Sequence, residues 1–112
     1  VEGEKLAKQY AELEKADQVD FYNGLEGYYS VLGYNKKQEA IAVLIEKNDH
    51  KIYVYQLDKG ISQDKAATIS REKGASDIDK VTFGRYQDKP IWEVKSGNQY
   101  YLVDFETGAV IQ

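Results

Sequence analysis

The sequence predicts an α+β protein made of two tandem units, each with one helix packed on an antiparallel sheet. In the second half, a helical pattern over residues 62–74 gives way to apolar residues at every second position across residues 81–105. The first half repeats the same order of signals, which indicates a duplication. A helix laid on one face of each sheet would bury both apolar faces. We therefore expect a first unit at residues 1–58 and a second at residues 59–112.

The helix of the second half carries recognisable signals at both ends. Ser62 is placed to cap its N-terminus, and Asp64 falls in the first turn, where the helix dipole favours a negative charge. Ala66 and Ile69 form a thin apolar stripe. Gly74 is expected just past the C-terminus, in the left-handed conformation that ends many helices.

The strands of the second half are separated by polar turns. Apolar residues alternate near 81–84, 91–95 and 101–105, as expected for strands with one buried face. The segments between them, 87–90 and 96–98, have compositions typical of hairpin turns. This pattern predicts a sheet of consecutive antiparallel strands.

The first half is predicted to begin with a longer helix. Residues 2–16 contain good helix formers, and Leu6, Tyr10 and Leu13 fall on one face. Residues 40–45 are almost all apolar, which is typical of a central strand buried on both faces.

Composition excludes several classes of function. The net charge of −4 comes from interspersed charges of both signs, which argues against a clustered basic surface for nucleic acid. There is no cysteine and no apolar run near 18 residues, so neither disulfides nor a membrane span is expected in this stretch. The chain starts at a valine, from which we expect an upstream segment that could hold a signal or an anchor.

The residues that could carry chemistry do not converge on one site. A Ser-x-x-Lys pattern occurs twice, at 62–65 and 70–73, but helix capping explains the first, and two matches in one helix show how common the pattern is. The single histidine, His50, follows a polar turn and lacks companion ligands. Asp104 is expected to hydrogen-bond its own turn. We therefore predict a protein that is not an enzyme and uses no cofactor or metal.

One group of second-half residues, taken together, resembles a known repeat. Its order and spacing are similar to those of a PepSY-type repeat, and the whole chain resembles the YpmB/TseB-like family, whose members carry a cell wall elongation regulator domain. The residues that form this signature are Ser62, Ala66, Gly74, Trp92, Asp104, Thr107 and Gly108. The resemblance covers the whole chain, but its specific motifs lie in the last 52 residues, and the first half matches less well.

The resemblance implies a structure, a location and a partner. It implies two cystatin-like (PepSY-like) repeats, held on the extracytoplasmic face of a Gram-positive cell membrane by an N-terminal transmembrane helix that precedes this chain. It implies regulation of peptidoglycan synthesis during elongation, through contact with a penicillin-binding transpeptidase. It brings no catalytic residues, no cofactor and no nucleic-acid partner.

Three functional hypotheses follow. The first is a non-enzymatic interaction module that binds its protein partner through sheet tyrosines or an open strand edge. The second is a peptidase-inhibitor or propeptide-like PepSY module, which an exposed apolar hairpin tip would favour. The third is a binder of small molecules or wall polymers, which a deep aromatic-lined cleft between the repeats would favour. Ten tyrosines are present, and the candidate contact residues are Tyr28, Tyr53, Tyr55 and Tyr100.

Overall fold

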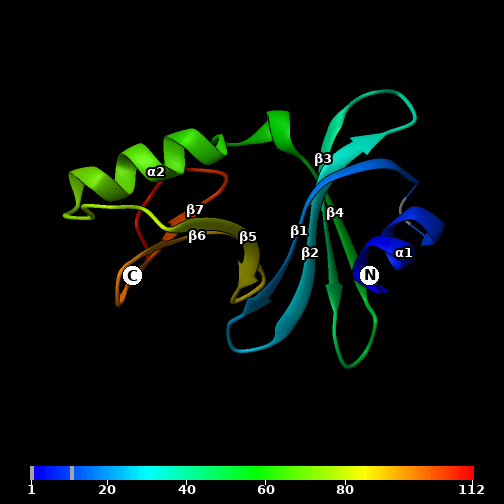
Figure 1. Ribbon diagram of the computed structural model, residues 1–112, viewed down its shortest axis with the longest axis horizontal. Coiled ribbons are helices and arrows are strands. Elements are labelled where there is room, and N and C mark those ends of the chain that lie inside the picture. Colours follow the sequence, from blue (N-terminus) through cyan, green and yellow to red (C-terminus); the bar gives the residue numbers. More distant parts are fainter. Residues whose placement is uncertain (1, 11) are drawn as a thin grey trace. The chain divides into compact units, whose positions relative to one another are not determined.

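The computed structural model describes residues 2–10 and 12–112, except for the side chains of Glu2 and Tyr10. The chain divides into two compact units, Val1–Leu57 and Asp58–Gln112. Within the described ranges, each unit contains one α-helix and one antiparallel sheet (Figure 1). The predicted α+β class is therefore confirmed. None of the helices in those ranges is long and apolar enough to cross a membrane.

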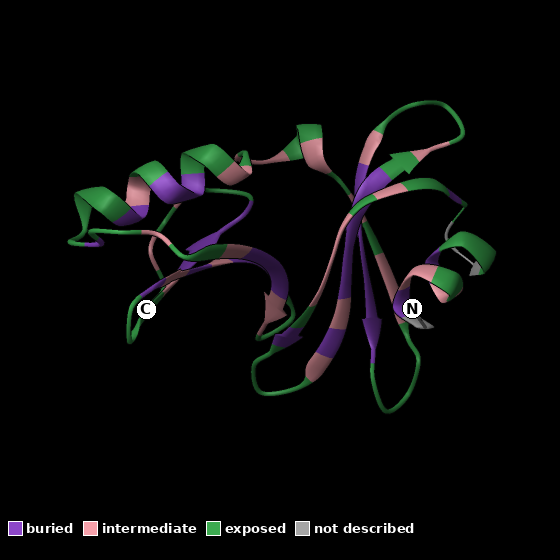
Figure 2. Ribbon diagram, viewed as in Figure 1, coloured by how far each residue is buried: buried purple, intermediate pink, exposed green. Residues whose placement is uncertain are grey.

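The first unit is a four-stranded sheet with one helix, ordered β1-β2-β3-β4 and antiparallel throughout. Its elements are α1 (Glu2–Tyr10), β1 (Leu13–Asn23), β2 (Gly27–Asn35), β3 (Ala40–Glu46) and β4 (Ile52–Gln56). One cluster of buried residues joins α1 to one face of the sheet, and its members are Ala7, Leu13, Val31, Ile41, Val43 and Ile45. β2 and β3 are the inner strands, and Figure 2 shows buried residues along both.

The first helix is shorter than predicted. It ends at Tyr10, and Leu13 already begins β1, opposite Asn35 of β2. Glu12, just before the strand, has a left-handed φ of 56°. The backbone therefore changes direction within the segment that sequence periodicity assigned to one helix. Tertiary pairing outweighed helix propensity here, because β1 gains a long ladder with β2. Leu13 is buried in the same core that helical spacing predicted, but it reaches that core from a strand.

The second unit has a three-stranded sheet ordered β5-β6-β7, with α2 against it. Its elements are η1 (Leu57–Lys59, which begins at the unit boundary), α2 (Gln63–Glu72), β5 (Lys80–Tyr86), β6 (Lys89–Ser96) and β7 (Gln99–Asp104). The predicted turn at 87–90 is shorter. Only Gln87 and Asp88 form it, with φ of 49° and 66°, and Pro90 lies within β6. Positive φ at both central residues suits the right-handed twist of a two-residue hairpin.

Local signals place both ends of α2. The Ser62 hydroxyl oxygen accepts a hydrogen bond from the Lys65 amide at 3.0 Å. Past the C-terminus, Gly74 has a φ of 116°. The Trp92 indole N–H, from β6, donates to the Ile61 carbonyl at 3.0 Å and so ties the segment before α2 to the sheet.

The turn after β7 is organised by Asp104. Its Oδ1 accepts hydrogen bonds from the Glu106 and Thr107 amides, at 2.8 and 3.1 Å. The Thr107 hydroxyl accepts one from the Ala109 amide, and Gly108 has a φ of 82°. The chain then returns along β7, because the Ile111 amide donates to the Leu102 carbonyl. Asp104 thus occupies the structural role expected of it.

Candidate protein-binding surface

The four candidate tyrosines differ in exposure. Tyr28 is only 3% exposed, with ring centroids 6.4 Å from Tyr22 and 6.3 Å from Tyr53. Tyr53 and Tyr55 are half-buried on β4, and Tyr100, in the second unit, is 54% exposed. The expectation for Tyr28 as a contact residue is corrected, because its ring packs against the rings of Tyr22 and Tyr53 and is buried. Composition indicated aromatic residues on the sheets, but not which of them face solvent.

Exposed apolar side chains occur instead on the β1–β2 hairpin. Phe21 is 41% exposed and Leu25, in the turn, is 76% exposed. Phe21 packs edge to face on Tyr29, its partner across the ladder, with centroids 5.5 Å apart. The Lys47 ammonium lies 5.7 Å from the centre of the Phe21 ring, within range of a cation–π interaction. We call Phe21, Leu25, Tyr29 and Lys47 the hairpin patch.

The local sequence explains how an aromatic ring stays at this surface. Gly27 starts β2, and a Cβ there would lie 2.6 Å from Cζ of Phe21, so the ring lies over bare backbone. The Lys47 amide donates to the Gly27 carbonyl at 2.9 Å, which brings the β3–β4 turn beside the β1–β2 turn. The patch was not predicted from the sequence. The sequence feature that could have indicated it is Leu25, an apolar residue inside a turn, where polar residues are normally found because the turn is solvated.

Three carboxyl groups meet at the same end of this sheet. Glu46, at the end of β3, is only 8% exposed. Its burial, followed by its contacts with Glu26 and Asp49, raises the pKa of Glu46 above its ordinary value. The Tyr28 hydroxyl donates to Glu26 at 3.2 Å. The buried Tyr28 therefore contributes its hydroxyl group, as a hydrogen-bond donor, to this group of carboxylates.

We expect the substitution Glu46→Gln to stabilise the protein at neutral pH. Because the folded-state pKa of Glu46 is raised, the parent loses stability as pH rises from the ordinary glutamate pKa through the raised one. Glutamine has no charge to desolvate, so this loss should disappear. Chemical denaturation at a series of pH values measures it. At acidic pH, where Glu46 is protonated, parent and variant should have similar stability, and a gain that persisted there would contradict this cause.

Ser62, Ser70 and His50 were considered for catalysis or metal binding, and each has a different environment in the structure. Ser62 accepts the capping hydrogen bond of α2, and Ser70 is fully buried, where no substrate reaches its hydroxyl. His50 lies exposed in the β3–β4 turn with a φ of 57°. In the part of the chain that the structure describes, no group of three or more His, Cys, Asp or Glu side chains could hold a metal ion.

Comparison with known proteins shows the family. A family model, the cell wall elongation regulator TseB-like domain, matches residues 2–46. The chain is 38% identical over 114 residues to the probable cell wall elongation regulator TseB of Bacillus subtilis strain 168, which covers 95% of this chain and 70% of that protein. The chain belongs to the TseB-like family.

The solved structure of the YpmB protein from Bacillus subtilis agrees with the TseB-like fold. It superposes with a TM-score of 0.82 at 34% identity, over 99% of this chain and 92% of that one. The TseB-like family model matches within the first unit, where the hairpin patch lies. The motifs that suggested the family from sequence lie in the second unit, so these motifs and the family model cover different parts of the chain.

Proposed function

We propose that this TseB-like chain is a non-enzymatic regulator of cell wall elongation that acts through a penicillin-binding transpeptidase. The observation that carries the proposal is its 38% identity, across nearly its whole length, to a protein named as a probable cell wall elongation regulator. The proposed location is the extracytoplasmic face of the membrane, with an N-terminal transmembrane anchor upstream. The two units are proposed to be PepSY-like repeats, which their shared content of one helix and one antiparallel sheet supports.

The hairpin patch is the proposed contact surface for the transpeptidase. The patch presents two exposed apolar side chains, Leu25 at the turn and Phe21 with the Lys47 ammonium near its ring, which a partner could bury. Aromatic residues are enriched in such contacts because a large rigid ring buries much area at low entropic cost. Tyr29 supports Phe21 from β2, so little rearrangement is needed on binding.

The test is the affinity of the protein for the extracellular part of an elongation-type transpeptidase from the same cell. We expect Leu25→Ser to weaken binding about tenfold or more, because burying a leucine is worth about 1.5–3 kcal/mol. The fold should be unaffected, since Leu25 is 76% exposed. The matched control is Val54→Thr, which changes a 48% exposed apolar residue of the same unit outside the patch.

Two outcomes would contradict the proposal at different levels. If the parent protein shows no saturable binding at high micromolar concentration, direct contact through this domain is wrong. If the parent binds but Leu25→Ser does so equally well, the hairpin patch is not the contact surface. Weakening by Tyr100→Ser alone would then place the contact on the second unit, around the exposed candidate tyrosine found from sequence.

A peptidase-inhibitor or propeptide-like role is the second candidate, and one observation favours it. The hairpin turns at 48–50 and 96–98 are polar, whereas the β1–β2 tip carries the exposed Leu25. An apolar tip is the feature a module of this kind would insert into a substrate cleft. Dose-dependent inhibition of a wall-associated peptidase, lost in Leu25→Ser, would support this role over transpeptidase binding.

A further inference from the structure

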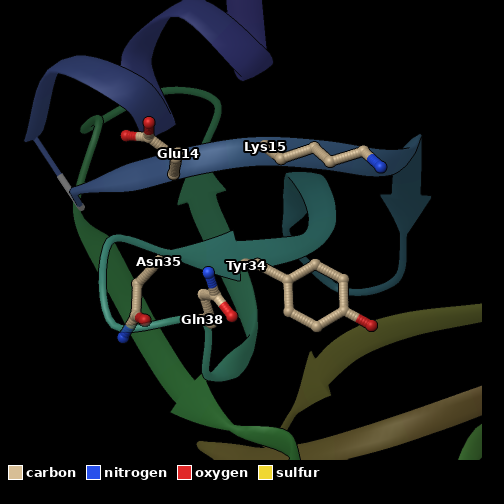
Figure 3. A pocket seen from close by; sticks show the side chains of 5 residues that line it. All are labelled: Glu14, Lys15, Tyr34, Asn35 and Gln38. Carbon is tan, nitrogen blue, oxygen red and sulfur yellow. The ribbon is translucent and has the colours of Figure 1, made fainter.

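A pocket lies at the opposite end of the β1–β2 ladder from the hairpin patch. It is formed where β1 begins and β2 ends, and its volume of about 340 Å³ is within the range of small-ligand sites. The residues that line it are Glu14, Lys15, Tyr34, Asn35 and Gln38 (Figure 3). All five belong to the first unit.

Tyr34 gives the pocket an aromatic surface. By strand alternation it shares a sheet face with Ser30 and Leu32, both under 9% exposed, yet Tyr34 itself is 41% exposed. Lys15 is its partner in the β1–β2 register, and Figure 3 shows the two side chains extending toward the same side. The Tyr34 ring is thus open to a ligand, and the Lys15 ammonium lies 3.7 Å from the Asp17 carboxylate.

Gln38 is held in the pocket by a well-ordered turn. The Asn35 Oδ1 accepts hydrogen bonds from the Lys37 and Glu39 amides at 3.0 and 2.9 Å, and its Nδ2 donates to the Glu39 carboxylate at 2.8 Å. The backbone N–H of Gln38 donates to the Asn35 carbonyl at 3.0 Å. With its own polar atoms used in this way, Asn35 organises the turn, and Gln38 supplies a side-chain amide to the pocket (Figure 3).

The backbone of Gln38 is in a conformation that glycine adopts more readily. Its φ is 64°, in the left-handed region that side chains with a Cβ disfavour. A glycine would satisfy the turn with less strain but would leave the pocket without this amide.

The pocket chemistry suits an uncharged sugar that carries an amide. One face of a hexose ring presents C–H groups, which pack on an aromatic face such as that of Tyr34. The side-chain amide of Gln38 can both donate and accept hydrogen bonds, which matches the N–H and C=O of an acetamido group. Lys15 and Glu14 contribute one charge of each sign, so the lining has no net charge to select an ionic ligand.

We propose that this pocket binds an N-acetylated sugar unit of a wall glycan. The proposal rests on the wall-related function proposed above, and adds to it a second ligand that the first unit recognises away from the hairpin patch. Tyr34 stacks on the sugar ring, Gln38 pairs with the acetamido group, and Lys15 donates to hydroxyl oxygens. The chain would then contact the glycan and its protein partner at opposite ends of one sheet.

The experiment is an NMR titration of the ¹⁵N-labelled protein with chitotetraose, a tetramer of N-acetylglucosamine. We expect saturable shifts concentrated at residues 14–15 and 34–38. Cellotetraose has the same linkage but no acetamido groups, and it should bind at least tenfold more weakly. Tyr34→Ser should abolish the shifts. If the parent shows no saturable shifts, or if both sugars bind equally, the proposal is wrong.

A glycine substitution separates binding from folding. Gln38→Gly should raise the melting temperature by relieving the left-handed strain, and it should weaken chitotetraose binding at least tenfold by removing the amide. The matched control is Gln87→Gly, which relieves a φ of 49° in a turn of the second unit and should leave binding unchanged. Unchanged affinity in Gln38→Gly would overturn the role of Gln38.

Failure of the glycan site is distinguishable from failure of the proposed function. Leu25→Ser should keep full chitotetraose binding, and Gln38→Gly should keep full transpeptidase binding. A protein that binds the transpeptidase but no sugar would overturn only the glycan site. A protein that binds the sugar but not the transpeptidase would overturn the proposed contact and leave the glycan site supported.

Discussion

Replacing Trp92 with alanine is expected to destabilise the second unit by about 3–5 kcal/mol, the largest effect among the proposed substitutions. Trp92 is 1% exposed, and its ring packs edge to face on Phe83 at 4.9 Å and on Phe105 at 6.4 Å. The truncation would leave a large cavity between α2 and the sheet and would remove the hydrogen bond to the Ile61 carbonyl. Both losses act on the same unit.

The measurement is urea unfolding followed by far-UV circular dichroism, because the variant lacks the chain's single tryptophan and its fluorescence. Amide hydrogen exchange should place the loss of protection in residues 58–112. Trp92→Phe is the control, since it keeps an aromatic ring but not the N–H donor to Ile61. It should cost less, about 1–3 kcal/mol for the unpaired carbonyl. An alanine variant that lost under about 1 kcal/mol would contradict the central role of this ring.

Gly33→Ala is expected to destabilise the first unit by about 3 kcal/mol or more, at or beyond the upper end of ordinary overpacking. A Cβ on Gly33 would lie 1.9 Å from the Lys15 carbonyl oxygen and 3.0 Å from the Ala16 Cα. These are backbone atoms, so no rotamer change can relieve the clash. The β1–β2 register is irregular beside this point, between Ala16 and Gln18, and the substitution would force the two strands apart.

The control for Gly33→Ala separates steric clash from backbone conformation. Gly97 has a φ of 62°, and a Cβ added to it would meet no other atom within 4 Å. Gly97→Ala therefore carries only the left-handed penalty of about 1 kcal/mol. Thermal unfolding of both variants should show the larger loss for Gly33→Ala. Equal losses of stability would mean that β1 moves away from position 33 without a cost in free energy.

Features set by near neighbours in the chain were predictable from sequence. The cap at Ser62, the left-handed Gly74 and the self-bonded turn of Asp104 each depend on atoms a few residues away. The alternation of β5, β6 and β7 follows from period-two burial in the same way. Such local determinants were sufficient for the α+β class and for the second helix.

Features that depend on contacts between distant segments were not predictable. β1 begins at Leu13 because pairing with β2 outweighs a helical pattern, and Tyr28 is buried because its ring packs on Tyr22 and Tyr53 from other strands. The hairpin patch requires the Phe21 ring to lie over Gly27 and beside Lys47, two positions brought together by sheet register.

The sequence alone thus determined the second helix with its caps, the strand alternation of the second unit, and the family that the chain resembles. Only the tertiary structure decided which side chains face solvent and which meet in a pocket. The physical reason is that burial and convergence depend on strand order and register, which set the neighbours of each residue across the sheet. Lys15, Tyr34 and Gln38 carry no common motif, and the pairing of β1 with β2 is what places them at one pocket.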